Sequence, residues 1–451
     1  MTSNYDPTRT YFDPNIPQIL PHENMYKIQI GSTLFKISGA SLSSDGPSYF
    51  TDFFTKLENE NNENNTTDAQ DGSIKNSMTC QKTLFIDRSA EIFKYIYQHL
   101  QGYYIDIKDE VQYTMLIADS MYYNLPRLRK ILKDSEYYYT KIGDVSFKLP
   151  KSIFDRDGDT YNYFYLTSDT LYVDIERVII SRKLIRPPPH SYSFVPRSPH
   201  LFKQLFELLC GATLTLDDNE RDSLITECRY YRLLNLEQKL IKCKIIDDSV
   251  THRNEIWIKL NDISKSGISI SNNMNDSEDN SEDTQDENDV NHVNKKIKLS
   301  DNHFLPYETI MYKRPYIETV PRILTIQIDD GISFIDVFKA KIMIGGKSRQ
   351  KFETLFKSML QKRLSIEIDN YSVFDKDLPF LSLSMTNLFN GEFLLDGHPC
   401  KFEDIMAIPV EKFRIKRSMW QIILYGEVSL VPIKLDIYST MSDLRKNEDY
   451  L

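Results

Sequence analysis

The stretch "FIDRSAEIFKYIYQHLQGYYIDI", residues 85–107, returns in altered form at 194–216 as "FVPRSPHLFKQLFELLCGATLTL". Arg88-Ser89 matches Arg197-Ser198 and Phe93-Lys94 matches Phe202-Lys203 at one constant offset. Further on, "YYNLPRLRKIL" (122–132) and "YYRLLNLEQKL" (230–240) share a Tyr-Tyr pair followed by leucines at identical spacings. Self-similarity at a fixed period indicates that one structural unit occurs twice in the chain.

Each copy carries the pattern of a capped amphipathic helix. Ser89 and Ser198 suit the N-cap position, where a side-chain oxygen accepts a hydrogen bond from a free backbone N–H. Apolar residues then recur at helical spacing, through Phe93 in the first copy and Phe202 in the second. Gly102 and Gly211 follow where a helix end needs a left-handed residue. Each copy therefore predicts a short strand, a core helix and two further helices.

A hairpin pattern precedes each core helix. "YKIQIGSTLFKIS" (26–38) alternates apolar and polar residues around a turn at Gly31, and "TKIGDVSFKLPKSIF" (140–154) can be laid over it. A helix is expected to begin near Ser48, and the Asn-rich residues 58–79 are expected to be a disordered insert. The first 24 residues, with four prolines, read as a loose lead-in.

The rest of the chain divides by composition. Residues 264–303 read as an acidic disordered linker, since eight acidic residues and no Lys or Arg lie between Asn272 and Asn294. Residues 304–451 are rich in strand patterns and predict a β-rich C-terminal domain. The expected fold class is α+β, with repeated units at 25–139 and 140–250 followed by that domain.

The bulk properties limit the class of protein. The chain has 451 residues, a net charge of −10 and five scattered cysteines without a CxxC pair. This favours reduced thiols in a nuclear or cytosolic protein over a disulfide scaffold. No apolar run is long enough for a membrane span, and the first residues do not resemble a signal peptide. The acidic linker carries most of the net charge, so no broad basic surface for nucleic acid is expected.

The first unit resembles the BTB/POZ domain of the potassium-channel tetramerisation (KCTD-like) type. Four blocks match in order: the opening hairpin, the first helix, the Ile-Asp-Arg…Phe signature with its Gly-terminated helix, and a Tyr-Tyr-x-Leu element. The second unit keeps most of the pattern but lacks the Asp before Arg197. The matching positions, structural in the family, are Gly31, Phe35, Ser48, Phe50, Asp87, Arg88, Phe93, Gly102, Tyr123, Arg197, Phe202, Gly211 and Tyr231.

The resemblance implies binding to other proteins. No residue of the repeated stretch is suited to catalysis, and no pair of His or Cys has the spacing of the zinc site found in some channel domains, so neither enzyme activity nor a cofactor or metal is expected. The expected partners are a second copy of the chain, a ubiquitin-ligase cullin or a signalling phosphatase. The segment at 408–428 is similar to the end of a fungal general-stress regulator that works as a phosphatase adaptor. The alternative is a nuclear transcriptional or chromatin cofactor acting through BTB contacts. Direct contact with nucleic acid is not expected, nor is membrane binding.

Three other motifs resemble a phosphate loop, a calcium loop and a nuclear import signal. "IMIGGKS" (342–348) lacks the first glycine of a phosphate loop, so it reads as a turn between a strand and a helix. Asp155, Asp157 and Asp159 begin like a calcium loop, but Leu166 stands where the bidentate Glu is needed. "NKKIKL" (294–299) fits an import signal through Lys295, Lys296 and Lys298, so the expected location is nucleus and cytoplasm.

Overall fold

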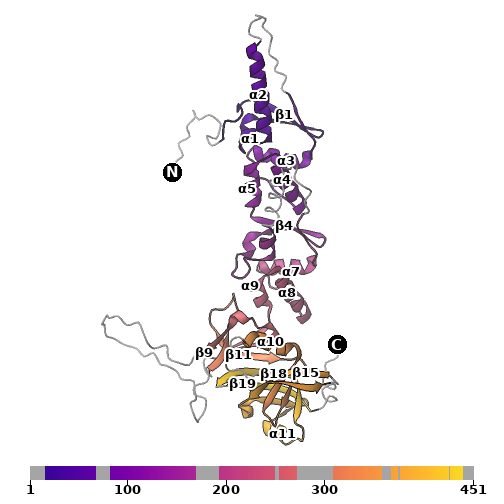
Figure 1. Ribbon diagram of the computed structural model, residues 1–451, viewed down its shortest axis with the longest axis vertical. Helices are drawn as coiled ribbons and strands as arrows, with labels where there is room; N and C mark the ends of the chain where they lie inside the picture. Colours follow the sequence, from indigo (N-terminus) through magenta and orange to yellow (C-terminus); the bar gives the residue numbers. More distant parts are fainter. Residues whose placement is uncertain are drawn as a thin grey trace, which may run out of the picture. The chain divides into compact units, whose positions relative to one another are not determined.

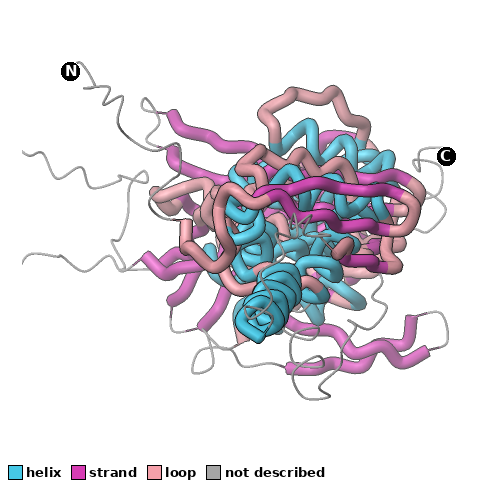
Figure 2. The backbone as a smooth tube through the Cα atoms, turned by 90° about the horizontal axis from the view of Figure 1, so that it is seen from above, coloured by secondary structure: helices cyan, strands magenta, loops and turns pink. Residues whose placement is uncertain are grey.

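The structure is a computed structural model, and it describes residues 16–67, 82–168, 192–248, 253–271, 308–357, 367–373, 376–425 and 427–439. The chain separates into two compact units, Met1–Leu236 and Glu237–Leu451. Figure 1 gives the elements of both units. The fold is mixed α+β, as the alternation of helices (cyan) and strands (magenta) in Figure 2 shows. None of the helices in these ranges combines the length and apolar character that crossing a membrane needs.

The first half of the N-terminal unit, which we call repeat 1, is a three-stranded sheet with helices. The sheet has the order β2-β1-β3, with β1 antiparallel to β2 and parallel to β3. Its elements are β1 (Met25–Ile30), β2 (Thr33–Ser38), α1 (Gly39–Ser43), α2 (Tyr49–Thr67), β3 (Leu84–Ile86), α3 (Ala90–Leu100), α4 (Glu110–Tyr122) and α5 (Pro126–Lys133).

The second half, repeat 2, has the same strand arrangement. The order is β5-β4-β6, again with one antiparallel and one parallel pair. Its elements are β4 (Tyr137–Ile142), β5 (Val145–Pro150), η1 (Lys151–Phe154), β6 (Phe194–Val195), α7 (Pro199–Leu209), α8 (Asp218–Tyr231) and α9 (Leu234–Leu240), and residues 163–168 are also helical. The repeated sequence therefore corresponds to a repeated architecture.

The core helix of each repeat is capped in the same way. Ser89 Oγ accepts from the backbone N–H of Ile92, and Ser198 Oγ accepts from that of Leu201, each at 3.4 Å. Gly102 and Gly211 follow the helix ends with φ of +83° and +95°, a region that costs any residue with a Cβ about 1–2 kcal/mol. These helix boundaries agree with the periodicity and the capping residues of the sequence.

Four aromatic rings fill the centre of each repeat. Around Phe93 lie Phe35 at 4.8 Å between ring centroids, Phe50 at 5.8 Å and Tyr123 at 5.7 Å. Around Phe202 lie Phe147 at 5.0 Å, Phe164 at 5.6 Å and Tyr231 at 4.9 Å. Phe93 and Phe202, both fully buried, thus occupy equivalent sites. Each ring set comes from a hairpin strand and three helices, so burying it fixes the arrangement of the whole repeat.

The C-terminal unit is built on one large sheet. In chain order the strands are β7 (Cys243–Asp248), β8 (Arg253–Lys259), β9 (Ile268–Ser271), β10 (Glu308–Tyr312), β11 (Arg322–Ile328), β12 (Phe334–Asp336), β13 (Lys341–Ile344), β14 (Glu367–Val373), β15 (Lys376–Met385), β16 (Glu392–Leu395), β17 (His398–Cys400), β18 (Lys412–Tyr425) and β19 (Glu427–Tyr438). The helical segments are η2 (Leu260–Asp262), η3 (Lys265–Gly267), α10 (Gly346–Phe356), η4 (Leu388–Asn390) and α11 (Phe402–Met406).

Five strands of this sheet close into a ring. β12 pairs with β13, β13 with β15, β15 with β19, β19 with β18, and β18 returns to β12. Closure satisfies the backbone groups that would otherwise be exposed at an open sheet edge. The segment "IMIGGKS" joins β13 to α10, so the prediction of a strand–turn–helix is confirmed. A Cβ at Gly345 would lie 2.6 Å from the Phe380 ring, so close packing accounts for that glycine.

Four boundaries differ from the sequence-based expectation. β4 begins at Tyr137 and pairs with β5, so residues 137–139 belong to repeat 2 and not to repeat 1. Residues 58–67 belong to α2, because helical hydrogen bonding continues into the Asn-rich segment; the remainder of the expected insert, 68–79, lies outside the described residues. Residues 264–271 contain η3 and β9, which pairs with β10, so they are not linker. β7 pairs with β8 in the C-terminal sheet, so residues 243–248 do not belong to repeat 2. Long-range strand pairing decides the last two boundaries.

Truncating Phe93 tests the central role of the ring cluster. We expect Phe93→Ala to lower the free energy of unfolding by about 3–5 kcal/mol, because a buried phenylalanine leaves a cavity behind. Urea unfolding of the full chain measures this, with Lys94→Ala on the exposed face of the same helix as the control. Equal stability of the two variants would show that the cluster does not hold repeat 1 together.

Candidate protein-interaction site

The signature arginine of repeat 1 forms a clamp between a strand end and a helix. Arg88 follows β3, and its Nη1 lies 2.5 Å from Oδ1 of Asp119 on α4. The guanidinium also lies over the Tyr122 ring, with Cζ 3.8 Å from the centroid. Burial raises the pKa of the Asp119 carboxyl, and the charge of Arg88 opposes part of that rise. Arg88 thus neutralises a carboxylate that is 5% exposed.

Repeat 2 has the same clamp with a longer acid. Nη2 of Arg197 lies 3.0 Å from Oε1 of Glu227 on α8, and Cζ lies 4.3 Å from the centroid of the Tyr230 ring. The Arg197 side chain is more exposed than that of Arg88, at 32% against 20%. Both signature arginines therefore tie the last strand of a sheet to the helix that supplies the central tyrosine.

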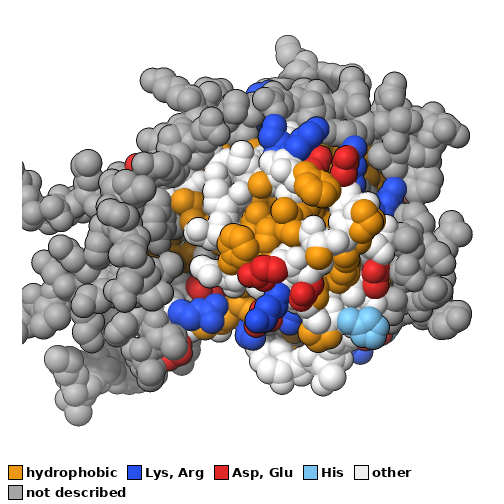
Figure 3. All heavy atoms as spheres, turned by 90° about the horizontal axis from the view of Figure 1, so that it is seen from below, with side chains coloured by type: hydrophobic (Ala, Val, Ile, Leu, Met, Phe, Trp, Pro, Cys, Tyr) orange, Lys and Arg blue, Asp and Glu red, His pale blue; other side chains and the backbone are white. Residues whose placement is uncertain are grey.

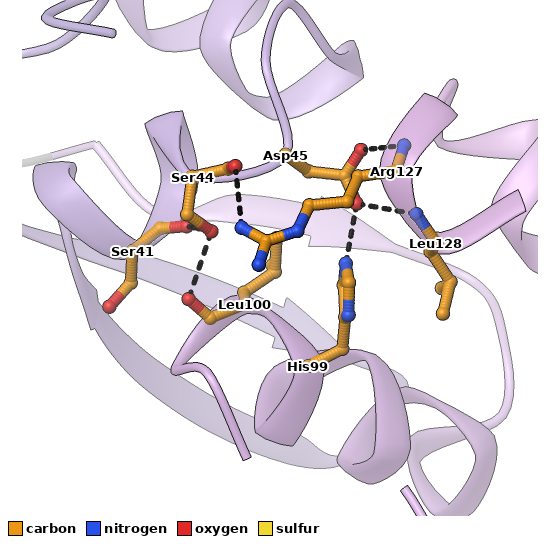
Figure 4. A network of polar contacts seen from close by, with 7 residues as sticks. All are labelled: Ser41, Ser44, Asp45, His99, Leu100, Arg127 and Leu128. Atoms are coloured by element: carbon orange, nitrogen blue, oxygen red, sulfur yellow. Dashed lines mark hydrogen bonds and ion pairs between the residues drawn. The ribbon is translucent and has the colours of Figure 1, made fainter. Parts of the chain in front are cut away.

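A second polar network fixes the start of α5, as Figure 4 shows. Asp45 accepts hydrogen bonds from the backbone N–H of Arg127 at 2.7 Å and of Leu128 at 2.9 Å. His99 Nε2 lies 2.6 Å from Oδ2 of the same carboxyl group. Asp45 is 5% exposed and His99 8% exposed, so this network stabilises the fold from inside.

Sequence reasoning missed this network and its counterpart. In repeat 2 the buried Asp159 accepts from the backbone N–H of Asn235 in α9 at 2.9 Å. The sequence does contain a signal for this network. The segments "DGPSYF" (45–50) and "DTYNYF" (159–164) both have an Asp, a helix-capping residue three positions later and then Tyr-Phe. Asp159, one of the three aspartates of the segment that begins like a calcium loop, therefore caps the start of α9. No group of three or more His, Cys, Asp or Glu in the described ranges is placed to hold a metal ion.

The other predicted positions lie as follows. Gly31 is in the β1–β2 turn with φ of +52°, and Ser48 Oγ accepts from the Thr51 N–H at the start of α2. Phe35, Phe50, Tyr123 and Tyr231 are buried in the ring clusters, whereas Asp87 is exposed beside Arg88. The structure brings together the aromatic and arginine positions within each repeat. Lys295, Lys296 and Lys298 lie outside the described residues.

Repeat 1 docks on the sheet of repeat 2. Tyr113 of α4 stacks on Tyr139 of β4, with centroids 4.7 Å apart. Glu110 accepts a hydrogen bond from Ser146 Oγ at 3.1 Å, and Asp106 pairs with Lys148 Nζ at 2.8 Å. Tyr139 is only 8% exposed as a result and belongs to the hydrophobic core of repeat 1. One repeat is thus a binding surface for the other.

A cavity of about 270 Å³ adjoins this junction. Its walls come from α4 and the end of α5 in repeat 1 and from β4, η1 and residues 164–168 in repeat 2. Tyr113, Tyr138 and Phe164 supply aromatic surface, and Lys133 and Lys151 supply positive charge. A second hollow, of about 320 Å³, lies beside Arg88 and Asp119.

The C-terminal unit also exposes apolar surface. On the face shown in Figure 3, hydrophobic side chains gather in the middle, with charged side chains around them. In this unit Phe389 of η4 is 72% exposed and Met406 of α11 is 43% exposed. Phe389 packs edge-on against Phe402, with centroids 5.5 Å apart, so its position is defined although its ring is open to solvent.

These features define a class: a chain with an internally repeated α+β module, in which one copy binds the other, joined to a β-rich unit. Residues 253–387 match the family described as the YLR108C C-terminal domain. The chain is 42% identical to "Uncharacterized protein YDR132C" of Saccharomyces cerevisiae over 98% of both chains. It is 32% identical to "BTB/POZ domain-containing protein YLR108C" of the same yeast over 96% of both. No solved structure gives a significant match.

The chain therefore belongs to the family of the yeast proteins YDR132C and YLR108C.

Removing the Arg88 guanidinium tests the clamp. Arg88→Ala leaves a buried carboxylate unpaired, and we expect a loss of about 3 kcal/mol near neutral pH, the lower end of the range for breaking buried pairs. The pKa of Asp119 is already raised in the folded state, and the variant raises it further. Ionisation of Asp119 then costs stability as the pH rises above the carboxyl's unfolded value, and protonation at lower pH removes that cost.

The loss should accordingly be larger at about pH 7.5 than at about pH 5, measured by urea unfolding of variant and wild type at both. Arg197→Ala is the matched control and should cost less, because Arg197 is more exposed. A loss for Arg88→Ala that is independent of pH would assign the effect to lost packing on Tyr122.

Proposed function

We propose that this chain is a non-enzymatic adaptor whose two repeats are BTB/POZ-like domains of the KCTD-like type. The observation that carries the proposal is the docking of α4, through Tyr113 and Glu110, and of the segment before it, through Asp106, on the sheet of repeat 2. A module that already binds a like module within one chain has the surface chemistry of a protein-binding domain. The printed name of YLR108C, a BTB/POZ domain-containing protein, supports the same assignment.

The roles of the buried polar residues of repeat 1 support a function without catalysis. Arg88 pairs with Asp119, and Asp45 binds two backbone N–H groups and His99. Groups engaged in this way hold helices in place, and they lack the exposure and freedom that a nucleophile or general base needs. The expected activity is therefore recruitment, in signalling, in the stress response or to a ubiquitin ligase.

Affinity purification of the tagged full-length chain from its own cells, followed by mass spectrometry, tests this function. We expect specific recovery of a protein partner: a cullin, a signalling phosphatase or a second copy of the chain. Phe93→Ala should lose that partner because repeat 1 unfolds, whereas Lys347→Ala should retain it. Recovery of chromatin proteins would favour the nuclear cofactor instead, and recovery of chaperones alone would contradict the proposal.

The location of the protein is a separate prediction. Lys295, Lys296 and Lys298 form a basic cluster of the import-signal kind, so we propose that the chain enters the nucleus as well as remaining in the cytoplasm. Changing all three to alanine should abolish nuclear accumulation of a fluorescently tagged chain. The same change to arginine is the control and should preserve it. Undiminished nuclear accumulation of the alanine variant would show that these three lysines are not an import signal.

A further inference from the structure

The two sheets of the repeats present equivalent outer faces that differ in what covers them. We call the first outer face the outward side chains of β1, β2 and β3, and the second outer face those of β4, β5 and β6. The first comprises Met25, Lys27, Gln29, Leu34, Lys36 and Phe85. The second comprises Tyr137, Tyr139, Lys141, Ser146, Lys148 and Phe194.

The correspondence follows from the strand registers. In repeat 1, Gln29 is paired with Leu34 on one side and with Phe85 on the other. In repeat 2, Lys141 is paired with Ser146 and Phe194 in the same way. One register step further, Lys27 lies opposite Lys36, as Tyr139 lies opposite Lys148. Lys27 and Lys36 are therefore the counterparts of Tyr139 and Lys148.

The covering of the second outer face shows what such a face binds. The N-terminal half of α4 and the segment before it lie across Tyr139 and Lys148. They contribute the Tyr113 ring and the carboxylates of Glu110 and Asp106. The ligand of the second outer face is thus a segment that leads into a helix, with acidic side chains at its start and an aromatic side chain about one turn into the helix.

No residue in the described ranges covers the first outer face in this way. Phe85 is 70% exposed, Leu34 49% and Met25 45%. The face also carries the ammonium groups of Lys27 and Lys36 and no acidic side chain, since its other members are apolar or neutral. Exposed apolar surface rimmed by charge of one sign is typical of a binding site for a partner of the opposite sign.

Helix α8 of a second copy of this chain does not supply the matching surface. The helix of repeat 2 equivalent to α4 is α8, and Asp217, Asp218 and Arg221 take the places of Asp109, Glu110 and Tyr113. In the same docking geometry Arg221 would lie against Lys27, and Asp218 against Leu34. Like charges and an apolar–charged contact oppose that arrangement.

We propose that the first outer face binds a helix of another protein that carries one carboxylate just before the helix for Lys36 and another about one turn into the helix for Lys27, at the places that Asp106 and Tyr113 take in repeat 2. Apolar side chains of the same helix pack on Leu34 and Phe85. This inference rests on the proposed function and specifies its partner chemistry. Repeat 2 shows the binding mode in cis, and repeat 1 offers the equivalent site in trans.

Site-specific photo-crosslinking in the full-length chain tests the proposal. The photoreactive amino acid p-benzoylphenylalanine replaces Leu34 or Phe85, and the chain is irradiated in its own cells. The matched control places the same group at Phe194, the counterpart of Phe85 on the second outer face. We expect crosslinks from positions 34 and 85 to a segment with one carboxylate just before a helix and another about one turn into it, at least about tenfold above those from position 194.

Charge variants sharpen the result. Lys27→Glu with Lys36→Glu should lower the crosslink yield about tenfold, whereas Lys27→Arg with Lys36→Arg should retain it. Thermal unfolding must show that both variants are folded. Reversing the partner's carboxylates to lysine should restore crosslinking to the glutamate variant.

Four results would each overturn the inference. The first two are crosslink yields at positions 34 and 85 no higher than at 194, and crosslinks to a second copy of the chain. The other two are a crosslinked segment without acidic residues, and a crosslink yield that does not change on charge reversal. Partners recovered by affinity purification together with any of these results would leave the adaptor function standing and remove only this site.

Discussion

The packing of a phenylalanine against a buried tyrosine holds each repeat together. Phe93 lies between Phe35 from the hairpin and Tyr123 from the end of α4, while Phe50 stacks on Tyr123 with centroids 4.8 Å apart. Aromatic pairs of this kind contribute about 0.5–1.5 kcal/mol each beyond the area they bury. Because the rings come from segments distant in sequence, burying them orders the sheet and the helices in one step. The clamp formed by Arg88 and Asp119 then fixes the helix that carries Tyr123.

The sequence predicted the parts of the fold that local chemistry controls. The caps at Ser89 and Ser198, the left-handed glycines and the helical periodicity all lie within about a dozen residues of each other, so they can be read directly. Asn124 and Arg232 have φ of +50° and +58°, yet neither is a glycine, so the sequence does not mark them as left-handed positions. They take the left-handed position after each tyrosine pair, where a residue with a side chain is tolerated at a modest cost.

What the sequence did not predict depends on contacts between distant residues. β7 lies next to the last helix of repeat 2 in sequence, yet its backbone hydrogen bonds go to β8 in the C-terminal sheet. The Asp45 network likewise joins residues more than fifty positions apart, and no local pattern indicates that Asp45 will reach Arg127. Comparing the two repeats with each other would have found it, because Asp159 recurs at the same place before a Tyr-Phe pair.

Comparing the two repeats also distinguishes the core residues, which stabilise the module, from the outer-face residues, which contact its ligand. Core positions are chemically matched in the two copies, Phe93 with Phe202 and Tyr123 with Tyr231, because each must fill the same enclosed space. Outer-face positions are matched only in part: Lys36 corresponds to Lys148 and Phe85 to Phe194, but Lys27 corresponds to Tyr139 and Leu34 to Ser146. Such divergence is consistent with different ligands, because a face committed to α4 and a face open to another protein are under different chemical constraints. Tyr139 is part of the hydrophobic core of repeat 1, so this part of the second outer face has a structural role, whereas Leu34 and Phe85 on the first outer face are exposed to solvent.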